Sequence, residues 1–333
     1  MKIQNRVYQL TNRHGVLVKF ISQGGKITSM QLPAKKGMTD IVVGYDQPDE
    51  YPTGDEYIGA LCGRFVNRIK NGRVQINGKT IQLSQNIPPH HIHGGFEGFH
   101  KKFWKVVPVE KQAYELHLFS PDGEEGYPGN LKVTVTYALT DDNEFIIDLK
   151  AVTDRLTIIN LTSHSYFNLN GPGEDNVLDH LLQIHADRYT PLDKDSITTG
   201  LLSPVENTPL DLRLPKRLTD VVRNEFPQIK SRGGLDLNWV LNKQGHELSP
   251  AAMLQSKKTG ITLEIFTTQY GLQVYTGQHL NSKGKKGFPL RPFCGITLET
   301  QNLPDAPNKP HFPSPYLFPG ETYHEKTIYR FHY

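Results

Sequence analysis

Apolar and polar residues alternate along many short segments of this 333-residue chain. The alternation has a period of two, which places successive side chains on opposite faces of a strand. Most of these segments are rich in β-branched or aromatic residues and are bounded by glycine, proline or asparagine, as strands joined by turns are. The clearest predicted strands occupy residues 15–22, 40–45, 131–140, 144–153, 261–268 and 272–277.

One hairpin can be predicted in detail. Within residues 71–83, two alternating runs flank Asn77-Gly78, a pair that readily adopts the positive φ angles of a two-residue type I′ turn. Helical patterning is weak, because only residues 218–226 suggest a turn or two of amphipathic helix, which Pro227 would end. Many strands and few helices predict an all-β fold, a large antiparallel β-sandwich. No repeat or linker divides the chain, so we expect residues 1–333 to form a single domain.

Charge and cysteine content narrow the range of partners. The formal net charge of +3 is small for this length, and the richest basic cluster, residues 283–287, is expected to be a solvated loop. We therefore expect no nucleic-acid partner. Cys62 and Cys294 cannot make a disulfide framework and are expected to be buried free thiols. Without an apolar leader or a run long enough to span a bilayer, the protein is expected to be cytoplasmic, with no membrane partner.

Polar residues gather beside glycine, proline and aromatic residues in a few stretches, which are the candidates for chemistry. These are residues 59–72, 90–95, 160–171, 296–308 and, more weakly, 233–241. His164 has a strand-like setting, with Tyr166 on the same face by alternation. A lone histidine of this kind is more often a satisfied core or rim residue than a functional one. Glu299 ends an otherwise apolar strand, where a carboxylate needs either an ion-pair partner or a role as a base.

Several kinds of site compete for these residues. His91 and His93 could share a metal ion, but no third ligand has a suitable spacing, so no metal site is predicted. A serine hydrolase would need a nucleophile turn of the G-x-S-x-G type, which the chain lacks. Asp236 and Glu299 could supply the carboxylate pair of a glycosidase. A histidine and a glutamate accompanied by arginine, amides and aromatic rings suit a neutral polyhydroxyl ligand, which predicts a sugar site with an acid–base pair.

Five sequence motifs resemble the signatures of the aldose 1-epimerases, also called galactose mutarotases, and occur in the same order. They are GRFVNRI (63–69), IHGG (92–95), HSYFNL (164–169), LETQNLPDAPN (298–308) and FPSPYLFPGE (312–321). The similarity covers almost the whole chain. It implies the large antiparallel β-sandwich of that family and an isomerase of galactose and hexose metabolism. Such an enzyme interconverts the α and β anomers of free aldohexoses such as galactose and glucose, and it needs no cofactor.

The resemblance also implies roles for individual residues. Glu299 matches the family's general base and His164 its general acid. Further residues match contacts to the substrate, namely Asn67, Arg68, His93, Tyr166, Asp236 and Gln273. In the implied reaction, ionised Glu299 takes the proton of the anomeric hydroxyl while protonated His164 gives one to the ring oxygen. The sugar ring opens and closes again on the other face of the carbonyl.

The chain departs from the family pattern at a few positions. Leu237 stands where a histidine usually follows the aspartate, and Ser163 stands where asparagine commonly precedes the catalytic histidine. The HGG loop carries the extra His90 and His91. We expect all of these residues at the edges of the pocket, the two histidines as exposed rim residues, where they bear on substrate preference rather than on reaction type. Gly94-Gly95 would let the backbone approach the sugar closely.

Rival functions use the same residues. They are an epimerase of another sugar, such as maltose or a phosphorylated hexose, a non-catalytic carbohydrate-binding relative, and the glycosidase considered above. The presence of both His164 and Glu299 argues against the non-catalytic relative. A phosphosugar enzyme would gather more cations than Arg64 and Arg68. The expected partner is a small-molecule aldose and the expected assembly is a monomer or a homodimer, while the preferred sugar stays open.

Overall fold

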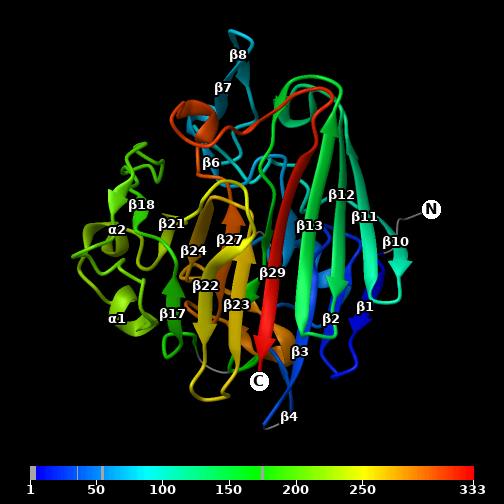
Figure 1. Cartoon of the computed structure of the whole chain (residues 1–333), viewed down its shortest axis with the longest axis vertical. Coiled ribbons are helices and arrows are strands. Elements are labelled where there is room, and N and C mark those ends of the chain that lie inside the picture. Colours follow the sequence, from blue (N-terminus) through cyan, green and yellow to red (C-terminus); the bar gives the residue numbers. More distant parts are fainter. Residues whose placement is uncertain (1–4, 36, 54–55, 174–175) are drawn as a thin grey trace.

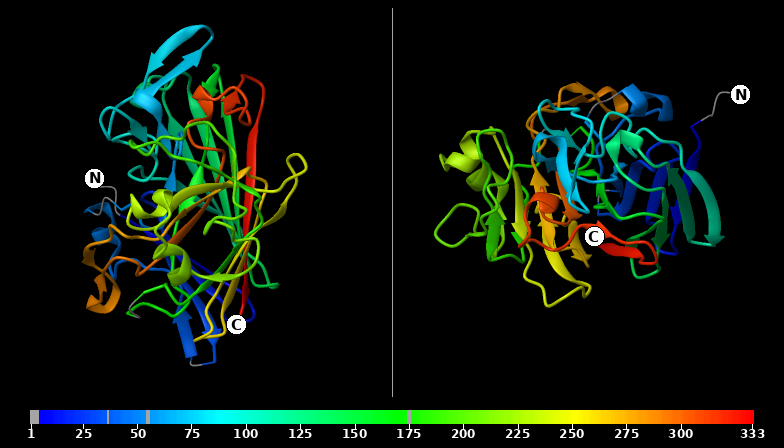
Figure 2. Two further views of the ribbon diagram at one scale, coloured as in Figure 1. Left: turned by 90° about the vertical axis from the view of Figure 1, so that its left-hand side faces the viewer. Right: turned by 90° about the horizontal axis from the view of Figure 1, so that it is seen from above.

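Strands that alternate in sequence form two facing layers of a β-sandwich in the computed structural model, which describes residues 5–35, 37–53, 56–173 and 176–333 (Figures 1 and 2). One layer is a nine-stranded sheet in the order β10-β11-β12-β13-β29-β23-β22-β17-β20. Its strands are β10 Lys105–Glu110, β11 Ala113–Ser120, β12 Leu131–Leu139, β13 Glu144–Thr153, β29 Tyr323–His332, β23 Thr262–Thr267, β22 Ser249–Gln255, β17 Leu181–Ile184 and β20 Lys216–Arg217.

The opposite layer consists of a six-stranded and a four-stranded sheet. The six-stranded sheet has the order β16-β27-β24-β21-β18-β19, and the four-stranded sheet the order β1-β2-β3-β4. The strands of the two sheets are β16 Tyr166–Phe167, β27 Ile296–Gln301, β24 Gly271–Tyr275, β21 Asp236–Val240, β18 Arg188–Thr190, β19 Ser203–Pro204, β1 Val7–Thr11, β2 Leu17–Ile21, β3 Ile27–Ala34 and β4 Gly37–Asp40.

Short strand pairs and helices complete the fold. The pairs are β5 Ala60–Cys62 with β15 Thr162–His164, β6 Arg68–Ile69 with β9 His91–Ile92, β7 Arg73–Ile76 with β8 Lys79–Gln82, β14 Thr157–Ile158 with β28 Tyr316–Leu317, and β25 Ser282–Lys283 with β26 Pro289–Leu290. The helices are α1 Leu218–Val222 and α2 Pro227–Lys230, with 3₁₀ turns at Pro48–Thr53, Lys70–Gly72, Glu124–Gly126, Lys285–Gly287 and Ala306–Asn308.

The core lies between the layers and explains the period-two pattern. In β12, every second residue is buried, because these side chains point toward the opposite layer. Phe20 of β2 packs edge-on against Tyr137 of β12, with ring centroids 5.1 Å apart. Phe167 of β16 contacts Tyr329 of β29 with centroids 5.4 Å apart. Aromatic side chains therefore join both smaller sheets to the large one, which confirms the predicted all-β sandwich.

Most predicted strands are confirmed, and the exceptions have local causes. Strands β2, β12, β13, β23 and β24 occupy the predicted positions. Residues 40–45 do not form a strand: β4 ends at Asp40, and Val42 makes only an isolated bridge to Phe167. The predicted helix at 218–226 ends at Val222, and Pro227 begins α2 instead of ending a helix, because proline fits the first turn.

The predicted hairpin is confirmed. Strands β7 and β8 pair in antiparallel register around Asn77 and Gly78, whose φ angles are 51° and 72°. Both angles are positive, as a type I′ turn requires. The hairpin projects from one end of the molecule (Figures 1 and 2).

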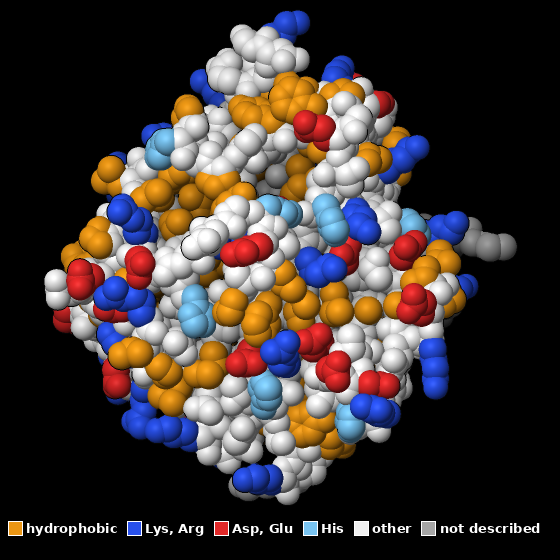
Figure 3. Space-filling model, in the orientation of Figure 1, with side chains coloured by type: hydrophobic (Ala, Val, Ile, Leu, Met, Phe, Trp, Pro, Cys, Tyr) orange, Lys and Arg blue, Asp and Glu red, His pale blue; other side chains and the backbone are white. Residues whose placement is uncertain are grey.

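The prediction for the two cysteines is confirmed, whereas the prediction for the basic cluster at residues 283–287 is wrong in part. Both Cys62 and Cys294 are buried free thiols, as expected. The prediction of a solvated loop at residues 283–287 is wrong for Lys285, which is buried and forms an ion pair with Asp40 at 2.9 Å. Side chains of both charge signs are interspersed on the face of the molecule seen in Figure 3. Within the described ranges, no helix is long and apolar enough to cross a membrane.

Candidate active site

Strand β27 forms the floor of the candidate site, and all six of its residues are buried. Alternation explains this, because Ile296 and Leu298 point into the main core while Thr297 and Glu299 point to the other face. The antiparallel register of β24 places Gln273 directly opposite Glu299. Strand β27 is thus buried on both faces, and Glu299, whose role the sequence left open, lies on the face opposite the main core.

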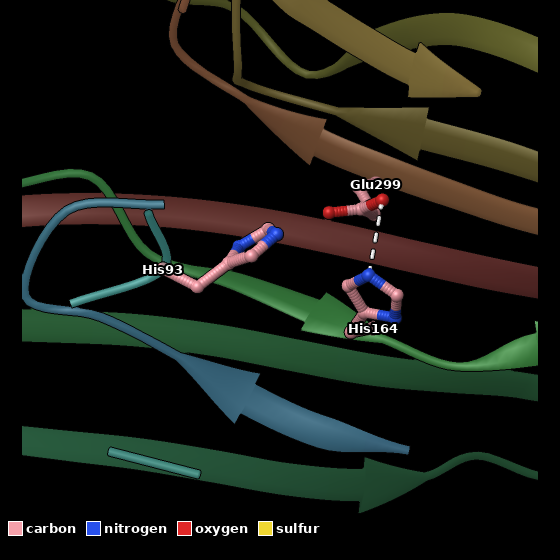
Figure 4. A group of neighbouring side chains, drawn as sticks. All are labelled: His93, His164 and Glu299. Carbon is pink, nitrogen blue, oxygen red and sulfur yellow. Dashed lines mark ion pairs between the residues drawn. The ribbon is translucent and has the colours of Figure 1, made fainter. Parts of the chain in front are cut away.

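His164 faces Glu299 across this floor (Figure 4). Its Nε2 atom lies 3.5 Å from Oε1 of Glu299, and the two residues are 4% and 1% exposed. Strand β15 holds the imidazole in place by pairing His164 with Ala60 of β5. Nδ1 of His164 and Oε2 of Glu299 are buried without a hydrogen-bond partner among the described residues. Since unpartnered buried polar atoms are costly, a hydrogen-bond partner from outside the chain would stabilise both.

Burial favours the neutral form of both members of this pair. It raises the pKa of Glu299 to about 8, an effect that nearby Asp236 reinforces and a hydrogen bond from Thr297 opposes. It lowers the pKa of His164 to about 4. Between these two values the pair together holds one proton. The ionised glutamate and protonated histidine of the expected reaction contain the same number of protons as this neutral pair.

A charged hydrogen-bond network forms one wall of the site. Arg68 contacts Asp236 through Nη2 and Oδ2, which are 3.3 Å apart. The other carboxylate oxygen of Asp236 accepts a hydrogen bond of 2.6 Å from Nε2 of Gln273. Guanidinium, carboxylate and amide groups are thereby fixed relative to one another, as the recognition of several hydroxyl groups requires.

His93 and Asn67 lie next to the short strand pair β6–β9, His93 directly after β9 and Asn67 directly before β6. Both residues adopt left-handed backbone angles, with φ of 50° for His93 and 65° for Asn67. The backbone N–H of Asn67 donates to Nδ1 of His93 at 3.4 Å. Asp305 of the LPDAPN motif holds this segment, because its N–H donates to the carbonyl of Arg68 at 3.1 Å and its Oδ1 accepts from the N–H of Lys70 at 3.0 Å.

All eight residues selected from the sequence line one cavity of about 250 Å³. They are Asn67, Arg68, His93, His164, Tyr166, Asp236, Gln273 and Glu299. A larger cavity of about 780 Å³ opens beside β3, β4 and Lys285, but its described lining contains no histidine. The smaller cavity is therefore the candidate active site, because it contains the acid–base pair.

The cavity is also lined by residues that the sequence reasoning missed, namely Glu56, Tyr57, Ile92, Tyr275 and His279. Tyr275 could have been found, since it is two residues from Gln273 on a strand and so shares its face. Glu56 and Tyr57 precede β5 in a segment without periodicity, where the sequence gives no such signal. The Tyr57 ring lies 4.7 Å from the His93 ring and 5.8 Å from the His164 ring, centroid to centroid.

The expectation that His90 and His91 are exposed rim residues is wrong. His91 is fully buried: its Nε2 lies 2.6 Å from the hydroxyl of Tyr127 and its Nδ1 2.7 Å from the carbonyl of Ser84. His90 is also buried, and its Nδ1 accepts a hydrogen bond from the N–H of Asn71 at 3.0 Å. Neither histidine lines the candidate active site. Both anchor the chain around the site.

The other departures from the family pattern do not lie at the pocket edge either. Leu237 follows Asp236 on β21, so its side chain points to the opposite face, where it is buried in the main core. Ser163 is buried, and its hydroxyl lies 3.4 Å from that of Ser165. Neither residue lines the cavity, so neither contacts the space that a substrate would fill.

The glycines after His93 have a different role from the one expected. A Cβ atom on Gly94 would lie 1.7 Å from the carbonyl oxygen of Gly63, and one on Gly95 would lie 2.1 Å from a carboxylate oxygen of Glu125. Both positions therefore require glycine because other parts of the chain lie against them. The backbone of Gly94 and Gly95 was expected to approach a ligand closely, but what it approaches closely is Gly63 and Glu125.

The metal pair considered from the sequence is not formed, because the hydrogen bonds of His91 hold it away from the site. Instead, His93, His164 and Glu299 place ligand atoms within 4.8 Å of one another. Two imidazoles and a carboxylate are groups that zinc accepts. A metal ion would occupy the same atoms that a sugar would contact in an acid–base reaction, so the two uses of the site exclude each other.

The chain is similar to known proteins over nearly its whole length. Residues 6–330 match the family described as aldose 1-epimerase. The galactose mutarotase of Mus musculus is 42% identical over 94% of this chain and 90% of its own length. The aldose 1-epimerase of Escherichia coli K12 is 36% identical over 98% of this chain and 95% of its own length. The crystal structure of an aldose epimerase homologue from C. elegans covers 99% of both chains with a TM-score of 0.92 and 31% identity.

Proposed function

The chain belongs to the aldose 1-epimerase family and interconverts the α and β anomers of an aldose, and from this premise we propose that Glu299 is its general base and His164 its general acid. The observation that carries the assignment is the distance of 3.5 Å between the two side chains on the floor of a cavity of sugar-binding character. Free galactose and glucose are the proposed substrates. Galactose is supported by the name of the Mus musculus relative, a galactose mutarotase.

The reaction consists of two proton transfers around one bond cleavage. Glu299 removes the proton from the anomeric hydroxyl, and His164 delivers a proton to the ring oxygen as the bond between C1 and that oxygen breaks. The bond electrons go to the ring oxygen, and the aldehyde at C1 rotates about the C1–C2 bond. The C5 hydroxyl then attacks the other face of the carbonyl while both proton transfers run in reverse. Positioned acid–base groups contribute roughly 10²–10⁴ in rate each.

The protonation of the pair agrees with this scheme. With one proton shared between Glu299 and His164, moving it from the carboxyl to the imidazole produces the reactive form without any exchange with solvent. A sugar hydroxyl that donates to Glu299 favours this transfer, because hydrogen bonds to an ionised carboxylate lower its pKa. Substrate binding thus prepares the base and the acid together.

The remaining residues of the cavity orient the sugar. Arg68 and Gln273 are held in place by Asp236, while the rings of His93 and Tyr166 both lie beside that of His164, with centroids 5.4 Å and 5.1 Å away. The hydroxyl of Tyr166 already donates to the carbonyl of Glu56 at 3.1 Å, so the proposed contact of Tyr166 is made by its ring. Asn67 also lines the cavity, next to His93.

Polarimetry tests the proposal directly. Freshly dissolved α-D-galactose and α-D-glucose should equilibrate faster with the enzyme than without it, and the final rotation should not change. Dialysis against EDTA should leave this rate unaltered, because the proposed reaction uses no metal or other cofactor. A rate that depends on added Zn²⁺ would contradict the acid–base assignment. Rotation that follows the blank with both hexoses would contradict these substrates, and maltose would be tested next.

Two further assays on the same purified protein distinguish an epimerase from two rival functions. A glycosidase that used Asp236 and Glu299 would release the chromophore from a chromogenic galactoside, whereas an epimerase releases nothing. A non-catalytic sugar-binding protein would leave the rotation rate at its blank value while still binding galactose in a calorimeter.

We also propose that the protein acts in the cytoplasm as a monomer or a homodimer. Two unpaired, buried thiols fit a reducing compartment. Fractionation of cells and light scattering on the purified protein test these two statements.

A further inference from the structure

The loop that carries His93 is held on both sides by residues 120–130, a segment far away in the sequence. After His93, the carboxylate of Glu125 accepts backbone hydrogen bonds from Phe96 at 3.1 Å and from Glu97 at 2.8 Å. Hydrogen bonds to an ionised acceptor are stronger than those between neutral groups. Gly95 is needed here, because any side chain at that position would collide with this carboxylate.

Before His93, the same segment holds His91. The carbonyl of Ser84 can only accept, so Nδ1 of His91 carries the proton and Nε2 accepts from the hydroxyl of Tyr127 at 2.6 Å. Both rings are fully buried and pack edge-on with centroids 5.4 Å apart. His93 therefore lies between two fixed points, His91 and the Phe96–Glu97 backbone, and both are supplied with partners by residues 125 and 127.

Arg64 ties this segment to the other half of the site. Its buried guanidinium donates to the carbonyls of Ser120, Pro121 and Gly129, each at 2.8 Å. Arg64 belongs to the GRFVNRI motif, which continues into Asn67 and Arg68. The segment 120–130 is thereby fixed to the motif that carries Asn67 and Arg68, and also to the loop that carries His93.

We propose that Glu125 and Tyr127 are positioning residues for His93, and that they set the affinity for the sugar without taking part in proton transfer. This inference rests on the proposed function, in which His93 contacts the substrate. It assigns a role to one of the two extra histidines of the HGG loop: His91 is the point through which Tyr127 fixes the loop. Neither Glu125 nor Tyr127 lines the cavity, so each acts only through the loop.

Substitution of Glu125 separates positioning from chemistry. In the Glu125→Ala variant, KM for galactose should rise roughly tenfold, as expected for the loss of hydrogen bonds to a charged acceptor. Its kcat should stay within about twofold and both limbs of its pH profile should stay in place, because the acid–base pair is untouched. Glu125→Gln retains one acceptor oxygen and should restore part of the affinity. The control is Glu97→Ala, in the same loop, whose exposed side chain forms an ion pair with Lys101.

A double-mutant cycle with His93→Ala identifies the path of the effect. If Glu125 acts through His93, then His93→Ala raises KM by itself, and adding Glu125→Ala raises it no further. Additive effects, or a KM unchanged in Glu125→Ala, would overturn the inference. A KM unchanged in His93→Ala would contradict the substrate contact itself, which is a failure of the proposed function.

Tyr127→Phe provides an independent variant that keeps the buried ring and removes the hydroxyl. It should move the NMR signals of the His93 imidazole in the sugar-free protein, as Glu125→Ala should, while Glu97→Ala should leave them in place. Unmoved His93 signals in both positioning variants would overturn the inference whatever their kinetics.

Discussion

Glu299 and His164 show how a buried environment adjusts two ordinary side chains to one reaction. Removal from water disfavours the charged form of each, which raises the pKa of the glutamate and lowers that of the histidine. The result is a pair that keeps a single proton over a wide pH range. The proposed reaction removes one proton from the anomeric hydroxyl and delivers one to the ring oxygen, so a pair that holds a single proton has the number it requires.

The pH dependence of the rate follows from these values. We expect kcat/KM for galactose to be bell-shaped, falling below about pH 4, where His164 binds a second proton, and above about pH 8, where Glu299 loses the last one. Initial rates of optical rotation in buffers of constant ionic strength measure the profile. A rate that keeps rising well beyond pH 9 would contradict the pair, once the faster uncatalysed reaction is subtracted.

The charges around the cavity predict which sugars are excluded. Among the described residues of its lining, three are acidic, namely Glu56, Asp236 and Glu299, and Arg68 is the one Lys or Arg side chain. We expect galactose 6-phosphate to have a kcat/KM roughly tenfold or more below that of galactose, because like charges repel in a partly desolvated site. Glu56→Gln should narrow this gap, and Glu97→Gln should not. Equal turnover of both sugars by the wild type would contradict the prediction.

Single residues were predictable where a motif marked them and unpredictable where packing decided. Glu299 and His164 lie in motifs, and the structure brings them together. His91 was misjudged, because its hydrogen-bond partner Tyr127 lies 36 positions further along the chain and nothing near His91 in the sequence indicates this contact. The role of Gly95 was misjudged for the same reason, since its neighbour Glu125 comes from the same distant segment.

At the scale of elements, β27 shows that one strand can serve the core and the site at once. Its outer face carries Thr297 and Glu299, while Thr300 points to the core, where its hydroxyl lies 2.6 Å from that of Thr327. In a half-exposed strand, alternation of apolar and polar residues shows which side chains share a face. Strand β27 is buried on both faces, so its sequence lacks this clear alternation. The strand itself and its neighbour β24 were predictable from β-branched residues. Their pairing, which aligns Gln273 with Glu299, was not.

Thr297 gives a test of this arrangement. Its hydroxyl donates to Oε1 of Glu299 at 2.9 Å and so stabilises the ionised carboxylate. In Thr297→Val the pKa of Glu299 should rise further, and the basic limb of the pH profile should move upward by about one unit, the effect of one hydrogen bond to a charged group. The acidic limb should stay in place. Thr300→Val is the matched control on the opposite face of the strand, and an equal shift in both variants would argue against this contact.

At the scale of the whole molecule, the site lies on the face of the six-stranded sheet that points away from the main core, where β24 and β27 meet the short strand pairs β5–β15 and β6–β9. The sequence was sufficient to predict an all-β sandwich, because strand patterns are local. It could not show that the C-terminal strand β29 lies between β13 and β23 in the nine-stranded sheet. The pairing of β13 with β29 joins residues as far apart as Glu144 and Arg330, and no local signal encodes it.

We propose that residues 1–333 form a single cooperative domain. One core contains side chains from both layers, among them Phe20, Tyr137, Phe167 and Tyr329. Differential scanning calorimetry should therefore record one endotherm, which galactose shifts to higher temperature because it binds the folded state. Two separate endotherms, of which only one responds to galactose, would show that the layers unfold independently.

The assignment of Glu299 and His164 is the central claim, and the rate of optical rotation of α-D-galactose with Glu299→Gln, His164→Asn and the double variant tests it most directly. Each single variant should lose at least about a hundredfold in kcat, and the double variant should lose little more, because the two groups act as one unit. Circular dichroism would establish that the variants are folded. Folded variants that equilibrate galactose at the wild-type rate would contradict the assignment and leave the family's activity to other residues.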